Sequence, residues 1–343
     1  MIGITKQTAA PGATWREDLP VPEVGPGEVL VKVKATAICG TDLHIYDWTP
    51  WAQARIKPPM VFGHEFAGEI VEVGQNVTGF KVGDRVAGET HISCGNCYFC
   101  QTGDQHICAD MKIIGVHVPG SFAEYISIPV SCAWKVSPSV SYEDAAFLEP
   151  LGVAIHGVLS GEIGNQTVAI FGCGPIGLMG INVASASGAN QIFAIEPIEE
   201  KVNLAKEMGA TTLLRPGKDD VLQAVMDATN GIGVDVVIDF SGSAKAIQSG
   251  LQILRKGGRM TLTGLPNLPV ELDLVDGVIY KEARINGTTG RRMYETWLQA
   301  DKLFQAGKLN LDPAKGGTFA LKDFEQAFAA IKAGKPGKMV LIP

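Results

Sequence analysis

The sequence Gly172-Cys173-Gly174-Pro175-Ile176-Gly177 decides the fold of the C-terminal half of this chain. It follows Val168–Phe171, a short apolar run with the length and composition of a buried parallel strand. It precedes Leu178–Ala186, a run of apolar and small residues that is typical of a packed helix. A G-x-G-x-x-G sequence can also be an ordinary glycine turn, but between a strand and a helix it predicts dinucleotide binding.

The spacing of the three glycines suits this prediction. Gly172 allows a tight turn, Gly174 lets the backbone approach a pyrophosphate, and Gly177 lets the helix pack closely on the strand. The free N–H groups at the start of the helix would face the phosphates. A second predicted strand, Gln191–Ile195, ends at Glu196, 19 residues after Gly177, where an acidic side chain binds the ribose hydroxyls of NAD.

Length and charge limit the classes of protein that the chain can belong to. Its 343 residues predict two domains. A net charge of -7 without any Lys/Arg block gives no electrostatic footprint for a nucleic-acid partner. Residues 163–195 lack charged side chains, but Pro175 and several glycines interrupt them, so we do not expect a membrane span. Residues 1–12 lack a signal-peptide pattern, and we expect a soluble, cytoplasmic protein.

Four of the seven cysteines are bunched with the spacing C-x2-C-x2-C-x7-C, namely Cys94, Cys97, Cys100 and Cys108. Four thiolates match the tetrahedral preference of zinc, and a closed four-cysteine set is typical of a structural site. Disulfides and an iron–sulfur cluster are the alternatives. The cluster pattern has three residues before its fourth cysteine and a proline after it, whereas here the gap is seven and Ala109 follows. Structural zinc is therefore the favoured prediction.

The two halves of the chain have different patterns. Short strands and glycine turns between Val29 and Val86 predict a compact β-rich domain. Strands and helices alternate in the second half, which predicts a doubly wound parallel sheet. A late helix, Asp323–Lys332, and a last strand, Lys338–Ile342, are expected to return to the first domain. We place the domains at 1–150 with 291–343, and at 151–290.

A second metal site is suggested by Cys39, His64, Glu65 and Glu149. A catalytic zinc takes about three protein ligands and keeps one open position. Taken singly, a cysteine or a histidine is more often a core or surface residue. Glu65 could form an ion pair, and Glu149, the only charge between Ala145 and Leu159, could be the acidic residue of a helix N-terminus. The residues alone leave the third ligand open.

These motifs together resemble a known family. Cys39-Gly40-Thr41-Asp42, Gly63-His64-Glu65, the four-cysteine segment and the glycine fingerprint, in this order, are similar to those of the zinc-containing medium-chain alcohol dehydrogenases. The resemblance runs from about Gly27 to the C-terminus. It implies an α/β protein with a GroES-like β-rich catalytic domain and a Rossmann NAD-binding domain. It also implies one catalytic and one structural zinc, and a homotetramer.

The resemblance assigns roles to individual residues. It implies catalytic zinc on Cys39, His64 and Glu65, with Glu149, where many members have a third cysteine, as a catalytic residue and an exchanging ligand. It implies a proton relay through Thr41 and His44. Thr41 could instead cap a helix, and His44 could be a solvated side chain. The implied cofactor contacts, beyond the glycines, are Ile176, Glu196, Lys201, Thr263, Gly264, Leu265, Thr288 and Thr289.

Two of these positions depart from the family pattern. Glu196 replaces the usual aspartate, and Lys201 stands where arginine is frequent, which leaves some room for a 2′-phosphate. Within the family, the runs 41–48, 147–152 and 290–297 are most similar to the subgroup that oxidises the 3-hydroxyl of L-threonine to 2-amino-3-oxobutanoate. The alternatives are a polyol dehydrogenase with the same zinc site and a non-catalytic module that binds zinc and NAD.

Overall fold

The computed structural model describes all 343 residues, which form two compact units. Unit 1 comprises residues 1–150 and 316–343, and unit 2 comprises residues 151–315. The sequence places the return to the first domain at residue 291, whereas in the structure residues 291–315 lie with unit 2. They do so because the Arg291 side chain lies against Gly152, and because Asn310 N donates a hydrogen bond to Asn182 Oδ1 at 3.0 Å.

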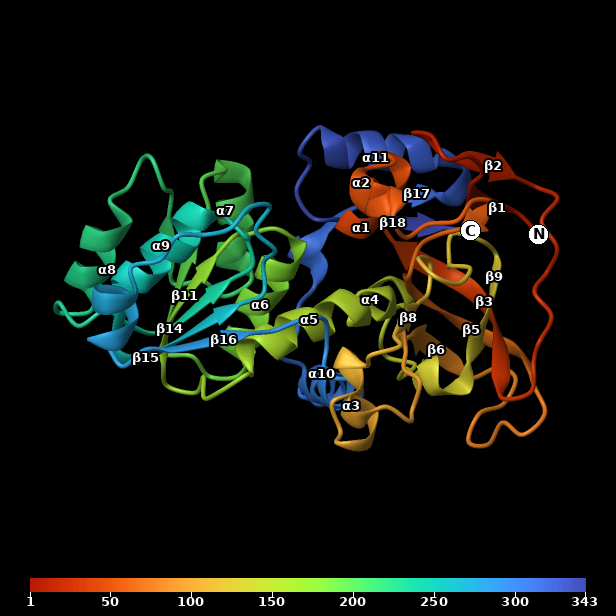
Figure 1. The fold of residues 1–343 in the computed structure, drawn as a ribbon, viewed down its shortest axis with the longest axis horizontal. Helices are drawn as coiled ribbons and strands as arrows, with labels where there is room; N and C mark the ends of the chain where they lie inside the picture. Colours follow the sequence, from red (N-terminus) through yellow and green to blue (C-terminus); the bar gives the residue numbers. More distant parts are fainter. The chain divides into compact units, whose positions relative to one another are not determined.

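Unit 1 is built mainly from β-strands (Figure 1). Its strands are β1 (Gly3–Lys6), β2 (Thr14–Arg16), β3 (Glu28–Ala37), β4 (Met60–Val61), β5 (Glu65–Val73), β6 (Arg85–Gly88), β7 (His91–Ile92), β8 (Lys112–Ile113), β9 (Tyr125–Pro129), β10 (Ala133–Lys135), β17 (Lys315–Ala320) and β18 (Lys338–Ile342). Its helices are α1 (Gly40–Tyr46), α2 (Pro50–Gln53), α3 (Tyr98–Gln101), α4 (Tyr142–Ala146) and α11 (Phe324–Lys332), with short 3₁₀ turns at Gln105–Ile107, Val130–Cys132 and Leu321–Asp323. Helix α5 (Leu148–Val158) begins in unit 1 and continues into unit 2.

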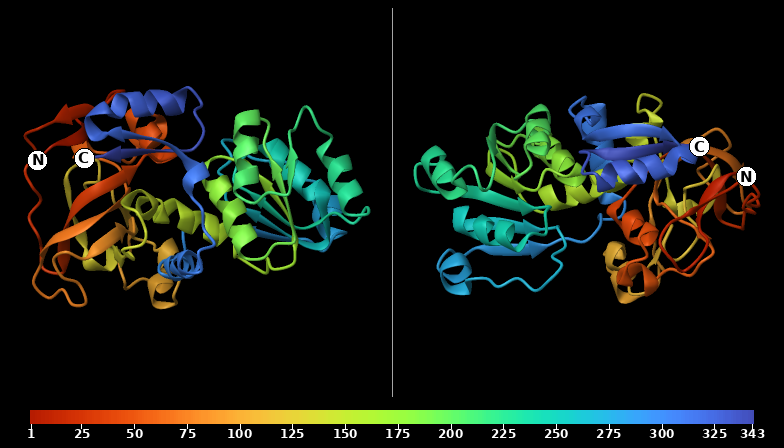
Figure 2. Two further views of the ribbon diagram at one scale, coloured as in Figure 1. Left: turned by 180° about the vertical axis from the view of Figure 1, so that it is seen from behind. Right: turned by 90° about the horizontal axis from the view of Figure 1, so that it is seen from above.

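The largest sheet of unit 1 has seven strands in the order β10-β6-β5-β3-β18-β17, with β9 also paired to β3. Strand β18 lies antiparallel to β3, with Val340 opposite Ala37. This pairing brings the C-terminal strand into the sheet of unit 1. Helices α1 and α11 lie side by side in Figures 1 and 2. The ring of Tyr46 in α1 stacks on that of Phe328 in α11, with ring centroids 4.5 Å apart. The C-terminal segment therefore packs against α1 and helps to fix its position.

Unit 2 is the predicted doubly wound sheet, with six parallel strands in the order β13-β12-β11-β14-β15-β16. The strands are β11 (Thr167–Phe171), β12 (Gln191–Ile195), β13 (Thr212–Leu214), β14 (Val234–Asp239), β15 (Leu254–Leu262) and β16 (Arg284–Gly287). The helices are α6 (Pro175–Ala186), α7 (Glu199–Glu207), α8 (Val221–Ala228), α9 (Ala244–Ile253) and α10 (Glu295–Gln305), with a π-helical turn at Val275–Ile279 and a 3₁₀ turn at Asp312–Ala314. Helices cover both faces of the sheet (Figure 2).

The glycine fingerprint forms the turn between β11 and α6. Gly172 has φ +88°, a left-handed conformation that side chains other than glycine rarely adopt. Gly174 is the N-cap of α6 and Pro175 its first residue, which suits a position without a hydrogen-bonded N–H. A Cβ atom at Gly177 would lie 1.8 Å from the carbonyl oxygen of Gly172. The third glycine is therefore required by the packing of the helix on the turn.

None of the helices has the length and apolar composition needed to span a membrane. The uncharged residues 163–195 are divided between β11, α6 and β12, as the sequence predicts.

We expect Gly177→Ala to lower the free energy of unfolding by about 1–3 kcal/mol, because the added methyl group cannot fit beside Gly172. Gly174→Ala is the matched control. Nothing lies within 4 Å of a Cβ at Gly174 and its backbone is extended, so its effect should stay within about 1 kcal/mol. Urea unfolding of both variants measures the difference, and equal losses would contradict this account of the turn.

Candidate metal and dinucleotide sites

Three predicted metal ligands meet inside unit 1. The candidate ligand atoms of Cys39, His64 and Glu65 all lie within 4.8 Å of one another. Cys39 immediately precedes α1, His64 precedes β5, and Glu65 is the first residue of β5. Because β5 pairs with β3, and Cys39 follows β3 by two residues, the sheet itself brings the two segments together. His64 and Glu65 are buried, and Cys39 is partly exposed.

Lys338 is a member of this cluster that the sequence patterns did not reveal. Its Nζ donates to Glu65 Oε1 at 2.5 Å and to the carbonyl oxygen of Ile38 at 3.2 Å, and both charged side chains are buried. Burial alone would lower the pKa of Lys338, but attraction to Glu65, Cys39 and Glu149 raises it above its ordinary value. Lys338 is therefore a fixed positive charge behind Glu65.

Asp42 is the second residue that the patterns did not reveal as functional. Its Oδ2 accepts a hydrogen bond from Cys39 N at 2.8 Å, and its Oδ1 faces His64 Nδ1 at 3.6 Å. A carboxylate in this position holds the ring of a ligating histidine so that Nε2 points to the metal. Its signal in the sequence is the position three residues after Cys39, where an acidic side chain can accept a hydrogen bond from the N-cap N–H of a helix.

The cluster carries more acidic groups than basic ones. Burial raises the pKa of the Cys39 thiol and of the Asp42 and Glu65 carboxyls, and the charge of Glu149 raises each of them further. Glu65 Oε2 is buried without a hydrogen-bond partner, as are Asp42 Oδ1 and His64 Nδ1. A divalent cation held by Cys39, His64 and Glu65 would give Glu65 Oε2 a partner, and a sulfur, nitrogen and oxygen donor set that keeps one position open suits zinc. The residues therefore fit a catalytic zinc.

Helix α1 carries the two residues expected to relay protons. Its first residue is Gly40 and its N-cap is Cys39, so Thr41 lies within the first turn and does not cap the helix. Thr41 and His44 are three residues apart and share one face of the helix. His44 is exposed, its Nδ1 lies 3.3 Å from Thr49 Oγ1, and its ring lies 5.9 Å from that of Trp51. The arrangement allows His44 to exchange protons with solvent.

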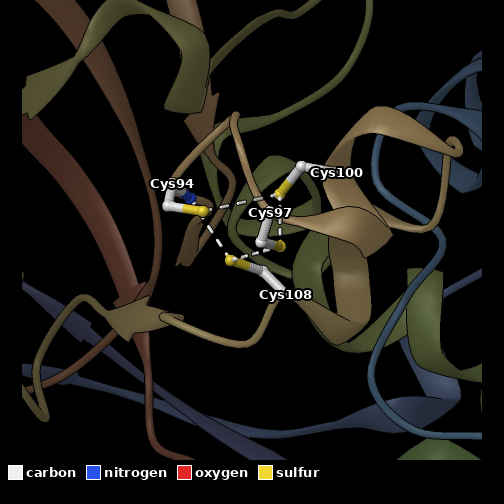
Figure 3. Close-up of side chains that lie close together, drawn as sticks. All are labelled: Cys94, Cys97, Cys100 and Cys108. Carbon is white, nitrogen blue, oxygen red and sulfur yellow. Dashed lines mark hydrogen bonds between the residues drawn. The ribbon is translucent and has the colours of Figure 1, made fainter.

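The four bunched cysteines form a separate group in the same unit. Figure 3 shows their sulfur atoms directed toward one another, with Cys97 3.5 Å from Cys100 and 3.8 Å from Cys108. These distances are too long for disulfides, and they agree with the edge of about 3.8 Å of a zinc tetrahedron with Zn–S bonds of about 2.3 Å. Backbone N–H groups of Ala109 and Cys100 lower the pKa of Cys97 to about 6, which favours the thiolate.

The dinucleotide candidates lie at the carboxyl edge of the parallel sheet in unit 2. A cavity of about 560 Å³ is lined there by Gly172, Glu196 and Lys245, among others. It lies beside β11, where the strand order reverses, which is the usual ligand position in such sheets. Glu196 is buried, its Oε2 accepts from Cys173 N at 2.9 Å, and its Oε1 accepts from Ile198 N at 3.1 Å. The acidic side chain is thereby fixed beside the glycine turn.

The remaining cofactor candidates lie outside the lining of this cavity. Thr263 and Thr288 follow β15 and β16, and their hydroxyl oxygens are 2.7 Å apart. Asp239, which the sequence did not single out, connects this part to the glycine turn. Its carbonyl oxygen accepts from Thr263 N and Gly264 N, and its buried carboxylate accepts from Gly242 N at 2.9 Å. Lys201 lies in the first turn of α7, Leu265 is 87% exposed, and Thr289 follows Thr288 beyond the end of β16.

Comparison with known proteins shows the family of the chain. Residues 25–138 match the alcohol dehydrogenase GroES-like domain, and residues 175–306 match the zinc-binding dehydrogenase family. The L-threonine 3-dehydrogenase of Pyrococcus abyssi is 48% identical over all 343 residues, which cover 98% of that protein. The chain belongs to the zinc-containing medium-chain alcohol dehydrogenase family.

Solved structures of the family have the same fold. Galactitol-1-phosphate dehydrogenase from Escherichia coli is 28% identical, with a TM-score of 0.92 over the whole of both chains. A short chain alcohol dehydrogenase from Escherichia coli CFT073, complexed with NADH, is also 28% identical, with a TM-score of 0.90 over 100% of this chain and 99% of that one. The GroES-like and Rossmann folds predicted from the sequence are therefore confirmed.

We expect Lys338→Met to lower the free energy of unfolding by about 3–5 kcal/mol, because it leaves the buried carboxylate of Glu65 without its ion pair. Lys332→Met is the matched control, since it breaks an ion pair with Asp47 at a partly exposed position. Its cost should be below about 1 kcal/mol. Urea unfolding at a fixed zinc concentration compares the two, and equal costs would show that the buried pair is not a structural requirement.

Proposed function

We propose that this protein is a zinc- and NAD-dependent dehydrogenase that oxidises the 3-hydroxyl of L-threonine to 2-amino-3-oxobutanoate. The meeting of Cys39, His64 and Glu65 in unit 1 carries the proposal of a zinc-dependent alcohol oxidation. Relatives named L-threonine 3-dehydrogenase, 45–48% identical over nearly the whole chain, support threonine as the substrate. In the reaction, the C3–H hydrogen leaves as hydride to NAD and the hydroxyl proton leaves to solvent.

Cys39, His64 and Glu65 would hold the catalytic zinc. When bound, zinc supplies Lewis acidity that lowers the pKa of the substrate hydroxyl. Asp42 orients His64, and Lys338 holds one oxygen of Glu65 while the other stays available. Glu149, whose charge acts on Cys39, Asp42 and Glu65, is proposed as a catalytic residue and exchanging ligand. Cys94, Cys97, Cys100 and Cys108 would hold a structural zinc that fixes their loop.

Thr41 and His44 would carry the hydroxyl proton away. Thr41 is placed at the first turn of α1, next to the ligand Cys39, and His44 is one turn further along at the surface. A histidine at the surface end of such a relay suits proton release near neutral pH.

NAD would bind at the carboxyl edge of the sheet in unit 2 and accept the hydride. Gly172, Gly174, Ile176 and Gly177 would form the turn against its pyrophosphate, and Glu196 would take the ribose hydroxyls. The fixed negative charge of Glu196 disfavours a 2′-phosphate, which supports NAD over NADP. Further contacts are proposed for Lys201, Thr263, Gly264, Leu265, Thr288 and Thr289.

Assembly and location complete the proposal. We infer a homotetramer in the cytoplasm. None of the seven cysteines forms a disulfide, as is usual in a reducing compartment. Light scattering coupled to gel filtration measures the assembly.

We expect NADH formation with L-threonine to exceed that with sorbitol, xylitol or ethanol, and NADP to be a poorer acceptor than NAD. Removal of zinc by a strong chelator should lower the rate by more than about 100-fold, because the Lewis acid contributes several kcal/mol to catalysis. Absorbance at 340 nm measures both. Faster turnover of a polyol would replace threonine but keep the zinc mechanism, whereas NAD binding without any turnover would indicate a non-catalytic module.

We expect Asp42→Asn to weaken zinc binding at the catalytic site by about 10- to 100-fold, because it removes the charge that orients His64. The asparagine oxygen can still accept from Cys39 N, so the start of α1 is preserved. Asp47→Asn, at the exposed end of α1, is the control with the same charge change. Zinc content after dialysis against graded chelator measures the affinity, and an unchanged affinity in Asp42→Asn would rule out the orienting role.

A further inference from the structure

The proposed substrate carries a carboxylate close to the reacting hydroxyl, and this inference rests on that proposed function. A carboxylate that enters a protein site is held best by a charge-assisted hydrogen bond, and the planar fork of arginine matches its two oxygens. The cationic side chains around the zinc cluster and α1 are therefore the candidates for its recognition.

Three of these cations already have partners. Lys338 is paired with Glu65 inside the cluster. Lys6 is buried and donates to the carbonyl oxygens of Ala10, Gly12 and Tyr46. Lys332 forms its ion pair with Asp47 at the end of α1. None of the three is available to a substrate without breaking an interaction that supports the fold.

Arg55 differs from them, because it has no acidic partner. Its guanidinium carbon lies 4.9 Å from the ring centroid of Trp51, and its Nη1 donates to the Trp51 carbonyl oxygen at 3.2 Å. The same tryptophan also lies near the proposed proton relay, because its ring centroid is 5.9 Å from that of His44. Ile56, the next residue, is buried in the core and fixes the backbone. Only one of the five N–H donors of the guanidinium is used.

A second segment also feels the charge of Arg55. The positive charge of Arg55 acts on His117, whose pKa is lowered first by burial and then by this charge. His117 belongs to the loop that packs on Gly63, the residue before His64. There, a Cβ at Gly115 or Gly120 would lie 2.3 or 2.2 Å from the Gly63 carbonyl oxygen. Arg55 is thus connected to the relay residue His44 through the Trp51 ring, and its charge reaches the loop that supports His64.

We propose that Arg55 binds the α-carboxylate of the amino-acid substrate, and that the Trp51 ring holds the guanidinium in place by stacking against it. Arg55 is then a specificity-determining residue, which selects an amino-acid alcohol over an uncharged polyol. It takes no part in the transfer of the proton or the hydride.

The test compares L-threonine with L-threoninol, which keeps the 3-hydroxyl and the amine but has a hydroxymethyl group in place of the carboxylate. In Arg55→Gln, we expect the KM for L-threonine to rise by about 10- to 100-fold with kcat nearly unchanged, and the KM for L-threoninol to stay the same. Arg55→Lys should recover part of the loss, because the charge returns without the fork. Lys57→Gln removes an exposed charge two residues away and should alter neither KM.

Each other outcome overturns the inference. An unchanged KM for L-threonine in Arg55→Gln would show that another group binds the carboxylate. Equal losses on both substrates would show a structural role, and an equal effect of Lys57→Gln would show a diffuse field effect. A wild-type enzyme that turns over L-threonine but gains nothing from Arg55 refutes the inference alone. A wild-type enzyme that does not prefer L-threonine over L-threoninol refutes both this inference and the proposed substrate.

Discussion

The structure of unit 1 depends on acidic groups that are buried together. The carboxyls of Asp42 and Glu65 are buried beside the partly exposed thiol of Cys39, and the charge of Glu149 acts on all three, yet only Lys338 and His64 oppose them there. Such groups are costly to bury unless they are paired. Lys338 offsets part of this cost, and the remaining acidic character suits the cluster to a divalent cation. A site of this kind lowers the stability of the fold but provides the ligands that a metal requires.

The chain path follows from the same requirement. Lys338 lies 273 residues after Glu65 and reaches it because β18 joins the sheet beside β3. The last segment thus returns to unit 1 and supplies the buried cation. Helix α11, which precedes Lys338 in this segment, packs in the same hydrophobic core as Ile45 of α1. Unit 2 has no comparable long-range constraint in its glycine turn, where Gly172, Gly177 and Glu196 are fixed by neighbours in one strand–turn–helix segment and the next strand.

This difference explains which features the sequence could predict. Strands β12 and β18 were predicted at their observed bounds, and the four cysteines and the glycine fingerprint were recognised, because spacing along the chain determines each of them. Lys338 left no such signal, because its partner Glu65 lies in a distant segment of the chain. Arg55 left none either, because its contact with Trp51 depends on the direction of the two side chains. The return to unit 1 was predicted at residue 291, too early, because contacts such as Arg291 with Gly152 cannot be read from the residue pattern.

Members of this family with one fold act on different alcohols, so the fold does not select the substrate. Galactitol-1-phosphate dehydrogenase has a TM-score of 0.92 to this chain at 28% identity. The buried zinc cluster cannot vary freely, because each change there exposes or unpairs a charge. The short segment from His44 to Ile56 can vary, since only Ile45, Ala52 and Ile56 of it are fully buried. Selection among substrates is therefore expected to reside in side chains such as Trp51 and Arg55, which lie beside the relay but outside the buried acidic cluster.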